Sequence, residues 1–165
     1  MRYLDMRYLI LFFLLPFGAS AQEGCDETPA LNERIVELAS AELNKKVGTG
    51  ECWDLAQMVL DETGADWDGY EEYGTIINHK TDCVYPGDII QFKNVKITWE
   101  DGKYTFEEEM KHHTAIVHEV LPDGNIILIH QNTGQHGRKV GTTLFRIEDM
   151  KKGKIMVYRP QGKTK

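Results

Sequence analysis

The sequence of 165 residues predicts an α+β fold in which amino-terminal helices pack on an antiparallel β-sheet. Between residues 30 and 62, apolar residues recur three and four positions apart, which is typical of helices with one buried face. From residue 86 onward, short apolar runs are separated by turns that contain glycine, which is typical of strands. Helices that precede a run of strands indicate an α+β domain rather than alternating α/β units. The length corresponds to one domain, or one domain with a tail.

The first 21 residues are expected to lie outside this domain. Arg2 and Arg7 make a basic start, residues 8–15 are apolar, and Ala19-Ser20-Ala21 supplies small residues. This pattern is typical of a cleaved secretory signal peptide, and the apolar run is short for a membrane span. The alternative is an uncleaved amino-terminal anchor. We therefore expect a secreted or periplasmic protein that leaves the membrane after cleavage of residues 1–21.

The rest of the chain is expected to form a leader at 22–30, one domain at 31–160 and a tail at 161–165. The formal net charge of −7 argues against general nucleic-acid binding, because phosphate contacts need clustered Lys and Arg. No segment after residue 21 is long and apolar enough for a second membrane span. We expect a monomer.

Two helices are predicted in the first half of the domain. The first runs from about Ala30 to Val47 and follows Pro29, which is tolerated at a helix start. The second begins near Glu51 or Cys52, runs to about Glu62 and ends at Gly64. Their apolar faces consist of Leu31, Ile35, Leu38, Ala39 and Leu43 in the first helix, and Cys52, Leu55, Ala56, Val59 and Leu60 in the second.

Residues 65–87 are predicted to form a long irregular surface loop, in which Trp67, Tyr70 and Tyr73 alternate with acidic residues. This loop is a candidate for one wall of a cleft. Glycine-containing turns at 100–102 and 122–124 predict two β-hairpins. The predicted strands are 89–92, 96–99, 103–106, 114–120, 125–130, 142–147 and 154–158.

All three cysteines lie after residue 21, at Cys25, Cys52 and Cys83. Exported proteins usually place cysteines in disulfides, and an odd number leaves one thiol over. The simplest partition joins Cys25 to Cys83 and leaves Cys52 free, although connectivity does not follow from sequence. In the alternative, all three are reduced and one or more are buried as small apolar side chains.

Cys52 is the candidate nucleophile. A thiol attacks as its thiolate, and a helix amino terminus lowers a thiol pKa through its unpaired N–H groups and dipole. Gly48 and Gly50 allow close approach of a substrate to this backbone, whose N–H groups are suited to hold an oxyanion. A catalytic Cys52 is then expected to alkylate quickly at mildly acidic pH. The alternative is a buried structural cysteine.

A cysteine nucleophile needs a base, usually histidine, and a group that orients that base. His113 begins one strand of a predicted hairpin and His130 ends its partner, so the two can be neighbours. We expect His113 to be the base, with small Ala115 on the same face allowing a helix to pack closely. His130 is the expected orienting group, and Asn132 is a further polar contact or the alternative orienting group. The remaining histidines, His79, His112, His118 and His136, are expected to be exposed.

Four segments, in this order, resemble the CHAP family (cysteine, histidine-dependent amidohydrolases/peptidases) and the related NlpC-type cell-wall peptidases. They are Gly50–Ala56 around the cysteine, Pro86–Phe92 as a core strand, His113–Val117 with the base, and Ile129–Asn132 with the third residue. The resemblance covers residues 48 to 132 and implies a papain-like fold with a half-barrel sheet. CHAP proteins often have an acid as third residue, whereas NlpC-type members commonly use histidine, as His130 here. His112 replaces a usual glycine, and the 95–111 segment is longer than the minimal fold needs.

The resemblance implies an exported cysteine hydrolase that cleaves amide bonds in peptidoglycan through an acyl-enzyme, without a metal or other cofactor. Whether it acts as a peptidase or as an amidase is left open, as is the bond that it cuts. One alternative is a non-catalytic module on the same fold that binds a cell wall or a protein partner. Another is a metal-binding protein that uses His112, His113, His130 and His136.

Overall fold

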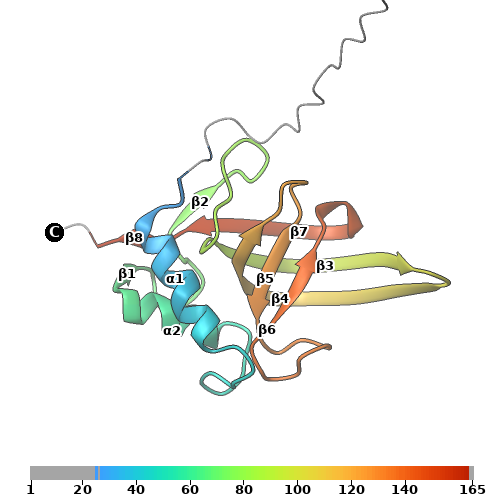
Figure 1. Cartoon of the computed structure of the whole chain (residues 1–165), viewed down its shortest axis with the longest axis horizontal. Coiled ribbons are helices and arrows are strands. Elements are labelled where there is room, and N and C mark those ends of the chain that lie inside the picture. Colours follow the sequence, from blue (N-terminus) through green and yellow to red (C-terminus); the bar gives the residue numbers. More distant parts are fainter. Residues whose placement is uncertain (1–24, 26, 164–165) are drawn as a thin grey trace, which may run out of the picture.

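Helices α1 (Ala30–Ala41) and α2 (Asp54–Thr63) pack together against a six-stranded antiparallel sheet with strand order β2-β7-β3-β4-β5-β6 (Figure 1). The computed structural model describes residues 25 and 27–163. The predicted signal peptide at 1–21 therefore lies outside the described residues. Within them, the predicted α+β fold class is confirmed.

The strands form one large and one small sheet. Strands β1 and β8 make the small sheet by themselves. The bounds are β1 (Ala65–Asp66), β2 (Thr75–Ile77), β3 (Ile89–Asp101), β4 (Tyr104–Val120), β5 (Ile126–His130), β6 (Gly141–Phe145), β7 (Met150–Arg159) and β8 (Gln161–Gly162), with a short 3₁₀ helix, η1 (Ile147–Asp149), before β7.

Strands β3 and β4 form one long hairpin that projects beyond the rest of the sheet (Figure 1). The sequence predicted separate short strands here, but pairing keeps one register from Ile89↔Ile116 to Asp101↔Tyr104. The projecting part is stabilised by stacking of Trp99 on Phe106, with ring centroids 5.4 Å apart. Cross-strand aromatic pairs of this kind stabilise a hairpin. The insertion at 95–111 is therefore an ordered extension of the sheet.

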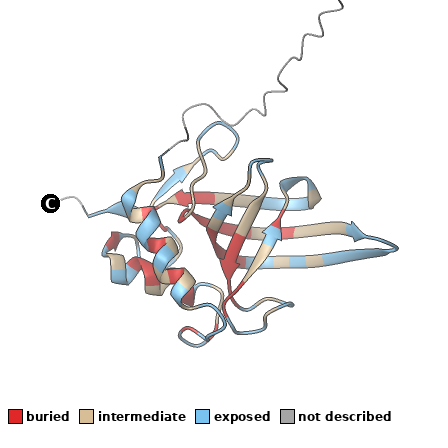
Figure 2. Cartoon of the chain, viewed as in Figure 1, coloured by how far each residue is buried: buried red, intermediate tan, exposed pale blue. Residues whose placement is uncertain are grey.

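The sheet separates two apolar clusters, and buried residues gather both beneath the helices and in the middle strands (Figure 2). Ile116 and Ile129 face the helices, whereas Ala115 and Leu128 belong to the cluster on the other face. Alternate residues of a strand point to opposite faces, so His113 also lies on the side away from the helices. Its ring centroid is 6.1 Å from that of Phe92. The expectation that a helix packs on Ala115 is therefore wrong.

Both helices are shorter than predicted. Helix α1 ends at Ala41 because the chain then pairs with the segment before β6. There the Asn44 N–H donates to the Val140 carbonyl at 2.9 Å, and the Val140 N–H donates to the Lys45 carbonyl at 2.8 Å. Helix α2 begins at Asp54, which leaves Cys52 in the turn just before it. These tertiary contacts override the helical pattern of the sequence.

The segment 65–87 is more ordered than the predicted surface loop. It contains β1 and β2, and β2 pairs with β7 at the edge of the large sheet. Tyr73 is only 1% exposed. Its ring stacks on Trp67 and meets Tyr158 edge-on, at centroid distances of 6.1 Å and 5.5 Å. Tyr73 is therefore a core residue, because its aromatic neighbours fill the space beside helix α2.

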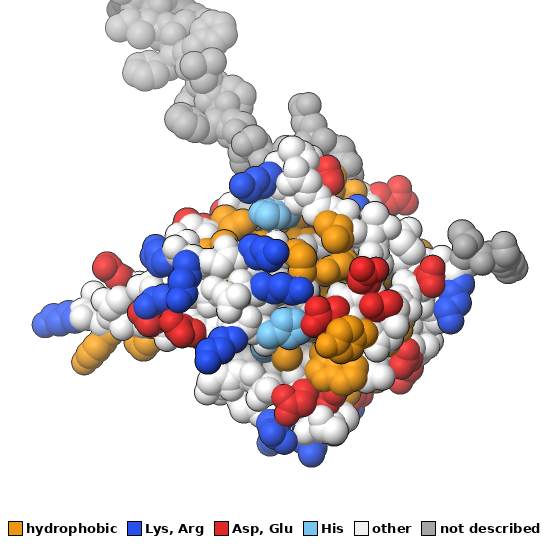
Figure 3. All heavy atoms as spheres, turned by 180° about the vertical axis from the view of Figure 1, so that it is seen from behind, with side chains coloured by type: hydrophobic (Ala, Val, Ile, Leu, Met, Phe, Trp, Pro, Cys, Tyr) orange, Lys and Arg blue, Asp and Glu red, His pale blue; other side chains and the backbone are white. Residues whose placement is uncertain are grey.

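The surface of the sheet carries charges of both signs. On the face turned away in Figure 1, Lys and Arg side chains form a broken band interrupted by Asp and Glu (Figure 3). Ion pairs tie neighbouring elements together, including Lys93 with Glu71 at 3.2 Å and Lys96 with Glu107 at 2.6 Å. The mixed charge is typical of a solvated surface.

Cys25 and Cys83 form a disulfide, and Cys52 is a free thiol. The predicted partition of the cysteines is therefore confirmed. The disulfide ties the start of the described chain to the segment before β3. In the described part of the chain, no helix has the length and apolar character of a membrane span.

Candidate active site

Cys52 lies in a turn that is shaped by the side chain of Asp54. Three successive N–H groups donate to Oδ2 of Asp54, from Thr49 at 2.7 Å, Gly50 at 2.9 Å and Glu51 at 3.1 Å. Gly48 has a φ of +56°, and a Cβ atom there would lie 2.8 Å from the same carboxylate oxygen. Glycine is needed here for both the backbone conformation and the space. The geometry just before Cys52 is thus set by local residues.

A buried glutamine joins the Cys52 segment to the end of β5. Gln131 is fully buried, and its Oε1 accepts the Val47 N–H at 3.1 Å. Its Nε2 donates to the carbonyls of Val47 at 3.0 Å and Glu51 at 2.8 Å. Because Gln131 directly follows His130, it fixes the Cys52 turn relative to the histidine-bearing strands. The sequence prediction gave Gln131 no role, although it follows β5 directly and lies two residues after Ile129, where the apolar face of the strand would continue.

His113 and His130 are in direct contact. His113 Nε2 and His130 Nδ1 are 2.8 Å apart, and His130 Nε2 lies 2.8 Å from the Thr143 hydroxyl. Both histidines are buried, with 7% and 5% of their surface exposed. The structure thus brings together the predicted base and the predicted orienting group, and adds Thr143 as a third member of the chain.

Burial keeps both imidazoles neutral at neutral pH. It lowers the pKa of His113 to about 4, with a further contribution from the nearby His112. It lowers the pKa of His130 to about 3, with contributions from His113 and His136. Of the possible tautomers, only one leaves the His113 Nδ1 lone pair free. In that tautomer His113 Nε2–H donates to His130, and His130 Nε2–H donates to Thr143.

The Cys52 thiol is also favoured in its neutral form. Burial raises its pKa, and the negative charge of Glu51 adds to the increase. The backbone N–H groups of Thr114, Cys52 and Trp53 act in the opposite direction, which places them close to the sulfur. The N–H groups near the start of the helix therefore do lower the pKa of the thiol, as the sequence predicted, but desolvation raises it by more. At neutral pH the resting pair is a thiol beside an imidazole.

Cys52 and His113 line one cavity of about 680 Å³. Three segments form its walls: Glu51–Trp53, residues 108–113 of β4, and residues 132–134. Among the described residues, no hydrogen bond joins the Cys52 thiol to the His113 ring. Catalytic hydrogen bonds in unliganded enzymes often shorten only when substrate binds. The two groups thus line one site without a hydrogen bond between them.

Asn132 lies at the rim of this cavity and not against His113. Its backbone has a φ of 61°, and its side chain donates to Glu51 Oε2 at 2.9 Å. Of the two candidate orienting groups, the structure places His130 on the base. Asn132 instead helps to hold Glu51, which precedes the candidate nucleophile.

The four histidines of the metal-binding alternative do not converge. His112 Nε2 lies 3.3 Å from Glu71 Oε1, and His136 Nε2 lies 3.1 Å from the Thr142 carbonyl oxygen. His136 was expected to be exposed in a loop, but it is half-buried against Gly141. The part of the chain that the structure describes holds no cluster of three or more His, Cys, Asp or Glu side chains suited to a metal ion.

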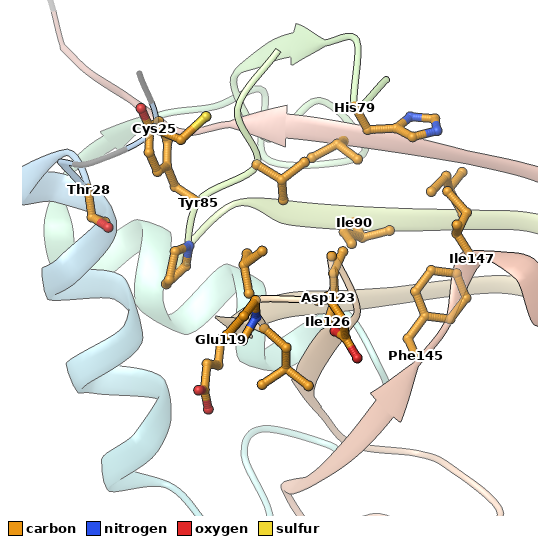
Figure 4. A pocket seen from close by; sticks show the side chains of 18 residues that line it. Cys25, Thr28, His79, Tyr85, Ile90, Glu119, Asp123, Ile126, Phe145 and Ile147 are labelled. Atoms are coloured by element: carbon orange, nitrogen blue, oxygen red, sulfur yellow. The ribbon is translucent and has the colours of Figure 1, made fainter. Parts of the chain in front are cut away.

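A second cavity, of about 800 Å³, lies between β3, β5, β6 and the disulfide (Figure 4). It shares no lining residue with the Cys52 cavity. Its walls are largely apolar, including Ile90, Ile126 and Phe145, and Glu119 and Asp123 also line it. The cysteine that lines it, Cys25, is held in the disulfide, so this cavity offers no thiol nucleophile.

Comparisons with known proteins agree with the fold. The solved structure titled "The crystal structure of Ly7917" aligns with a TM-score of 0.52 and 16% identity over 79% of this chain. The chain spans 62% of the length of that structure's chain, and at this identity the likeness concerns the fold alone. No curated protein matches the sequence. Residues 27–164 match the family described as the AIM3/BBC1 cysteine proteinase-fold domain, and the chain therefore belongs to this family and has its papain-like fold.

Proposed function

We propose that the protein is an exported cysteine hydrolase of amide bonds, with Cys52 as nucleophile, His113 as base and His130 as the residue that orients the base. One observation carries the proposal. Cys52 and His113 line the same cavity, while His130 holds the far nitrogen of the His113 ring. A nucleophile and a base that line one cavity, with an orienting group hydrogen-bonded to the base, are the components of nucleophilic acyl transfer.

The reaction begins from the neutral pair. Cys52 Sγ attacks the carbonyl carbon of the substrate while its proton passes to Nδ1 of His113. The backbone N–H groups of Cys52 and Trp53, which lie close to the sulfur, donate to the developing oxyanion. His113 then gives the proton to the leaving amine, and a thioester remains on Cys52. Water, deprotonated by His113, hydrolyses the thioester and restores the thiol.

His130 works through His113. When His113 takes up the proton, both of its ring nitrogens are donors, so Nε2–H needs an acceptor. His130 Nδ1 supplies this acceptor only while His130 Nε2 carries the hydrogen that it donates to Thr143. The strongly lowered pKa of His130 keeps it neutral and available for this role.

Peptidoglycan is the proposed substrate, with either a peptide cross-link or the amide between glycan and stem peptide as the target. The support is the ordered set of four segments that resemble CHAP and NlpC-type proteins, together with an open cavity at Cys52. Export is supported by the signal-like first 21 residues and by the Cys25–Cys83 disulfide, since disulfides persist in oxidising compartments.

The test uses the full chain purified after export. We expect it to release new amine-terminated fragments from purified murein, identified by mass spectrometry. Cys52→Ala and prior treatment with iodoacetamide are expected to abolish the release. Full activity in the Cys52→Ala protein would contradict the assignment of the nucleophile.

A second candidate function is a non-catalytic module that binds a wall polymer or protein on the same fold. The raised pKa of the Cys52 thiol favours it, as does the lack, among the described residues, of a hydrogen bond between this thiol and His113. The two candidates differ in one measurable property. In a hydrolase, replacing His113 by Ala must slow the reaction of Cys52 with an acyl substrate analogue, whereas in a binding module it does not.

A further inference from the structure

One edge of β4 is unpaired beside the candidate site. On the side away from β3, β4 pairs with β5 only between Ile116 and Val120. Strand β5 ends at His130, so in the described part of the chain no strand covers β4 between Tyr104 and Ala115. An exposed strand edge presents unpaired N–H and C=O groups that can pair with another extended chain.

This free edge points toward Cys52. The Val117 N–H donates to the Asp88 carbonyl at 2.8 Å, and the Val117 carbonyl accepts the Gly87 N–H at 2.7 Å, so the backbone groups of Val117 face the β3 side. Those of Thr114, three residues away, therefore face the free side, and the Thr114 N–H lowers the pKa of the Cys52 thiol. Backbone groups two residues apart on a strand face the same way, so those of His112 do so as well. On its other side, β4 keeps an unbroken register with β3 in this region, where Gln91 lies opposite Thr114 and Lys93 lies opposite His112.

The cavity follows the same edge. Six consecutive residues of β4, from Glu108 to His113, line it. Alternate side chains of a strand point to opposite faces, so a wall of consecutive residues indicates that the cavity runs along the strand edge. Such a length accommodates roughly 20 Å of extended chain at about 3.4 Å per residue. Glu51, Cys52 and Trp53 form the opposite wall.

The walls carry three carboxylates and one lysine, Lys111, and one of the carboxylates has no ionic partner. Glu51 pairs with Arg138 at 3.3 Å, and Glu109 pairs with Lys152 at 3.7 Å. Glu108 is half-buried, and within the described residues it has no hydrogen bond or ion pair. A desolvated carboxylate without a partner is complementary to a cation. The cavity therefore combines a strand edge with a place for a positive charge.

We propose that the cleft binds an extended peptide that pairs with the free edge of β4 as an added strand, and that Glu108 receives a basic side chain of this peptide. The backbone pairing supplies affinity, and the side-chain position supplies selectivity. This inference rests on the proposed hydrolase site and names the class of its substrate. The added strand leads from Glu108 past His112 to the Cys52 sulfur, where the scissile carbonyl is placed.

The first test measures binding without turnover. The full chain with Cys52→Ala is titrated with a fluorescent hexapeptide of alternating Ala and Lys, and with a series in which one amide at a time is N-methylated. Strand pairing predicts that methylation at every second amide weakens binding by about fivefold to tenfold, as expected for one lost hydrogen bond, while the intervening positions change little. A flat profile, or no binding at millimolar peptide, overturns the proposal.

The second test addresses Glu108. Glu108→Gln is expected to weaken binding of the Lys peptide by about threefold to tenfold and to leave an all-Ala peptide unchanged. Glu107→Gln is the matched control, because Glu107 is the neighbouring residue and its carboxylate already pairs with Lys96. Equal loss in both variants, or none in either, overturns the role of Glu108. Hydrolysis of murein by the unmodified protein is a separate readout, so failure of the peptide proposal is distinguishable from failure of the proposed function.

Discussion

The Nε2 atom of His113 lies 2.8 Å from the Nδ1 atom of His130. Two buried, neutral imidazoles share one hydrogen bond, and its direction decides which nitrogen of His113 is free. Thr143 continues the chain at the far nitrogen of His130. The orientation of the candidate base is therefore set by residues of β5 and β6 and not by the cavity itself.

Replacing His130 by Leu is expected to lower kcat by about a hundredfold, because protonated His113 loses its acceptor. KM should change little, since His130 is buried and does not line the cavity. Steady-state kinetics on a defined amide substrate separates the two constants. Thr143→Val serves as the milder comparison, and its kcat is expected to fall by only several-fold. An unchanged kcat in His130→Leu would argue against the orienting role.

Alkylation of Cys52 by iodoacetamide is expected to be slow at pH 6. The raised pKa keeps the thiol protonated, so the rate should climb by about tenfold per pH unit through the neutral range. Stopped samples analysed by mass spectrometry give the rate at each pH, and Cys52→Ser defines the background. A rapid plateau at pH 5 to 6 would instead indicate a preformed thiolate–imidazolium pair.

The free energy of unfolding is expected to fall as the pH is lowered from about 7 to about 4. Both histidines have folded pKa values far below the ordinary 6.5, so the unfolded chain takes up more protons in this range. Their stabilisation is complete above pH 6.5 and is lost on acidification, by about 1.4 kcal/mol per pH unit for each histidine. Urea unfolding at several pH values measures the slope. In His130→Gln the slope should be shallower, and an identical slope would contradict the assignment.

Gln131→Leu is expected to destabilise the protein by about 3 kcal/mol, because it leaves the Val47 N–H and the carbonyls of Val47 and Glu51 without a partner. The Cys52 turn should also lose its register with β5, which lowers kcat. Chemical denaturation and kinetics report the two effects. Gln135→Ala, an exposed residue of the loop that follows, should stay within about 0.5 kcal/mol of the unmodified protein.

Removing the disulfide by Cys25→Ser with Cys83→Ser is expected to lower the free energy of unfolding by about 4 kcal/mol. The bond closes a loop with a sequence separation of 58, and the estimate follows from the entropy of that loop in the unfolded chain. Thermal unfolding with and without reductant checks it. The double variant should be insensitive to reductant, whereas Cys52→Ser, which keeps the disulfide, should lose as much stability on reduction as the unmodified protein.

The chemistry-bearing residues were predictable where a local pattern places them. Cys52 follows two glycines near a helix start. His113 lies within β4 beside the end of β5 at His130, so their proximity follows from the antiparallel pairing of these two strands. The odd number of cysteines indicated one leftover thiol, whereas the pairing of Cys25 with Cys83 was only the simplest of the possible partitions. These features follow from short-range patterns in the sequence and from the number of cysteines. Patterns of the same kind, the helical and strand periodicities, also predicted the α+β fold class.

The rest depends on contacts between distant segments. Helix α1 stops early because Asn44 and Lys45 pair with Val140, and no residue near Ala41 signals this. Tyr73 looked exposed beside acidic residues, yet it fills a gap against Trp67 and Tyr158.

The direction of the pKa shift of Cys52 could not be predicted from the sequence pattern either. The dipole argument predicted a low thiol pKa, but the desolvation that reverses it depends on the packed surroundings of Cys52. Which face of β4 meets the helices also followed only from the packed sheet, and it excluded the role expected for Ala115.

The network around Gln131 has a consequence for the order of folding. The turn before Cys52 closes through Asp54 over only three to five positions of sequence, whereas Gln131 reaches Val47 across 84 positions. Short-range loops close quickly and cheaply, and long-range contacts form late. The thiol-bearing turn is thus expected to be shaped early, while the base reaches it only when the last strands dock. A chain that is not yet folded, or is still being exported, would then carry an unreactive thiol. Catalytic activity would arise only with the last step of folding.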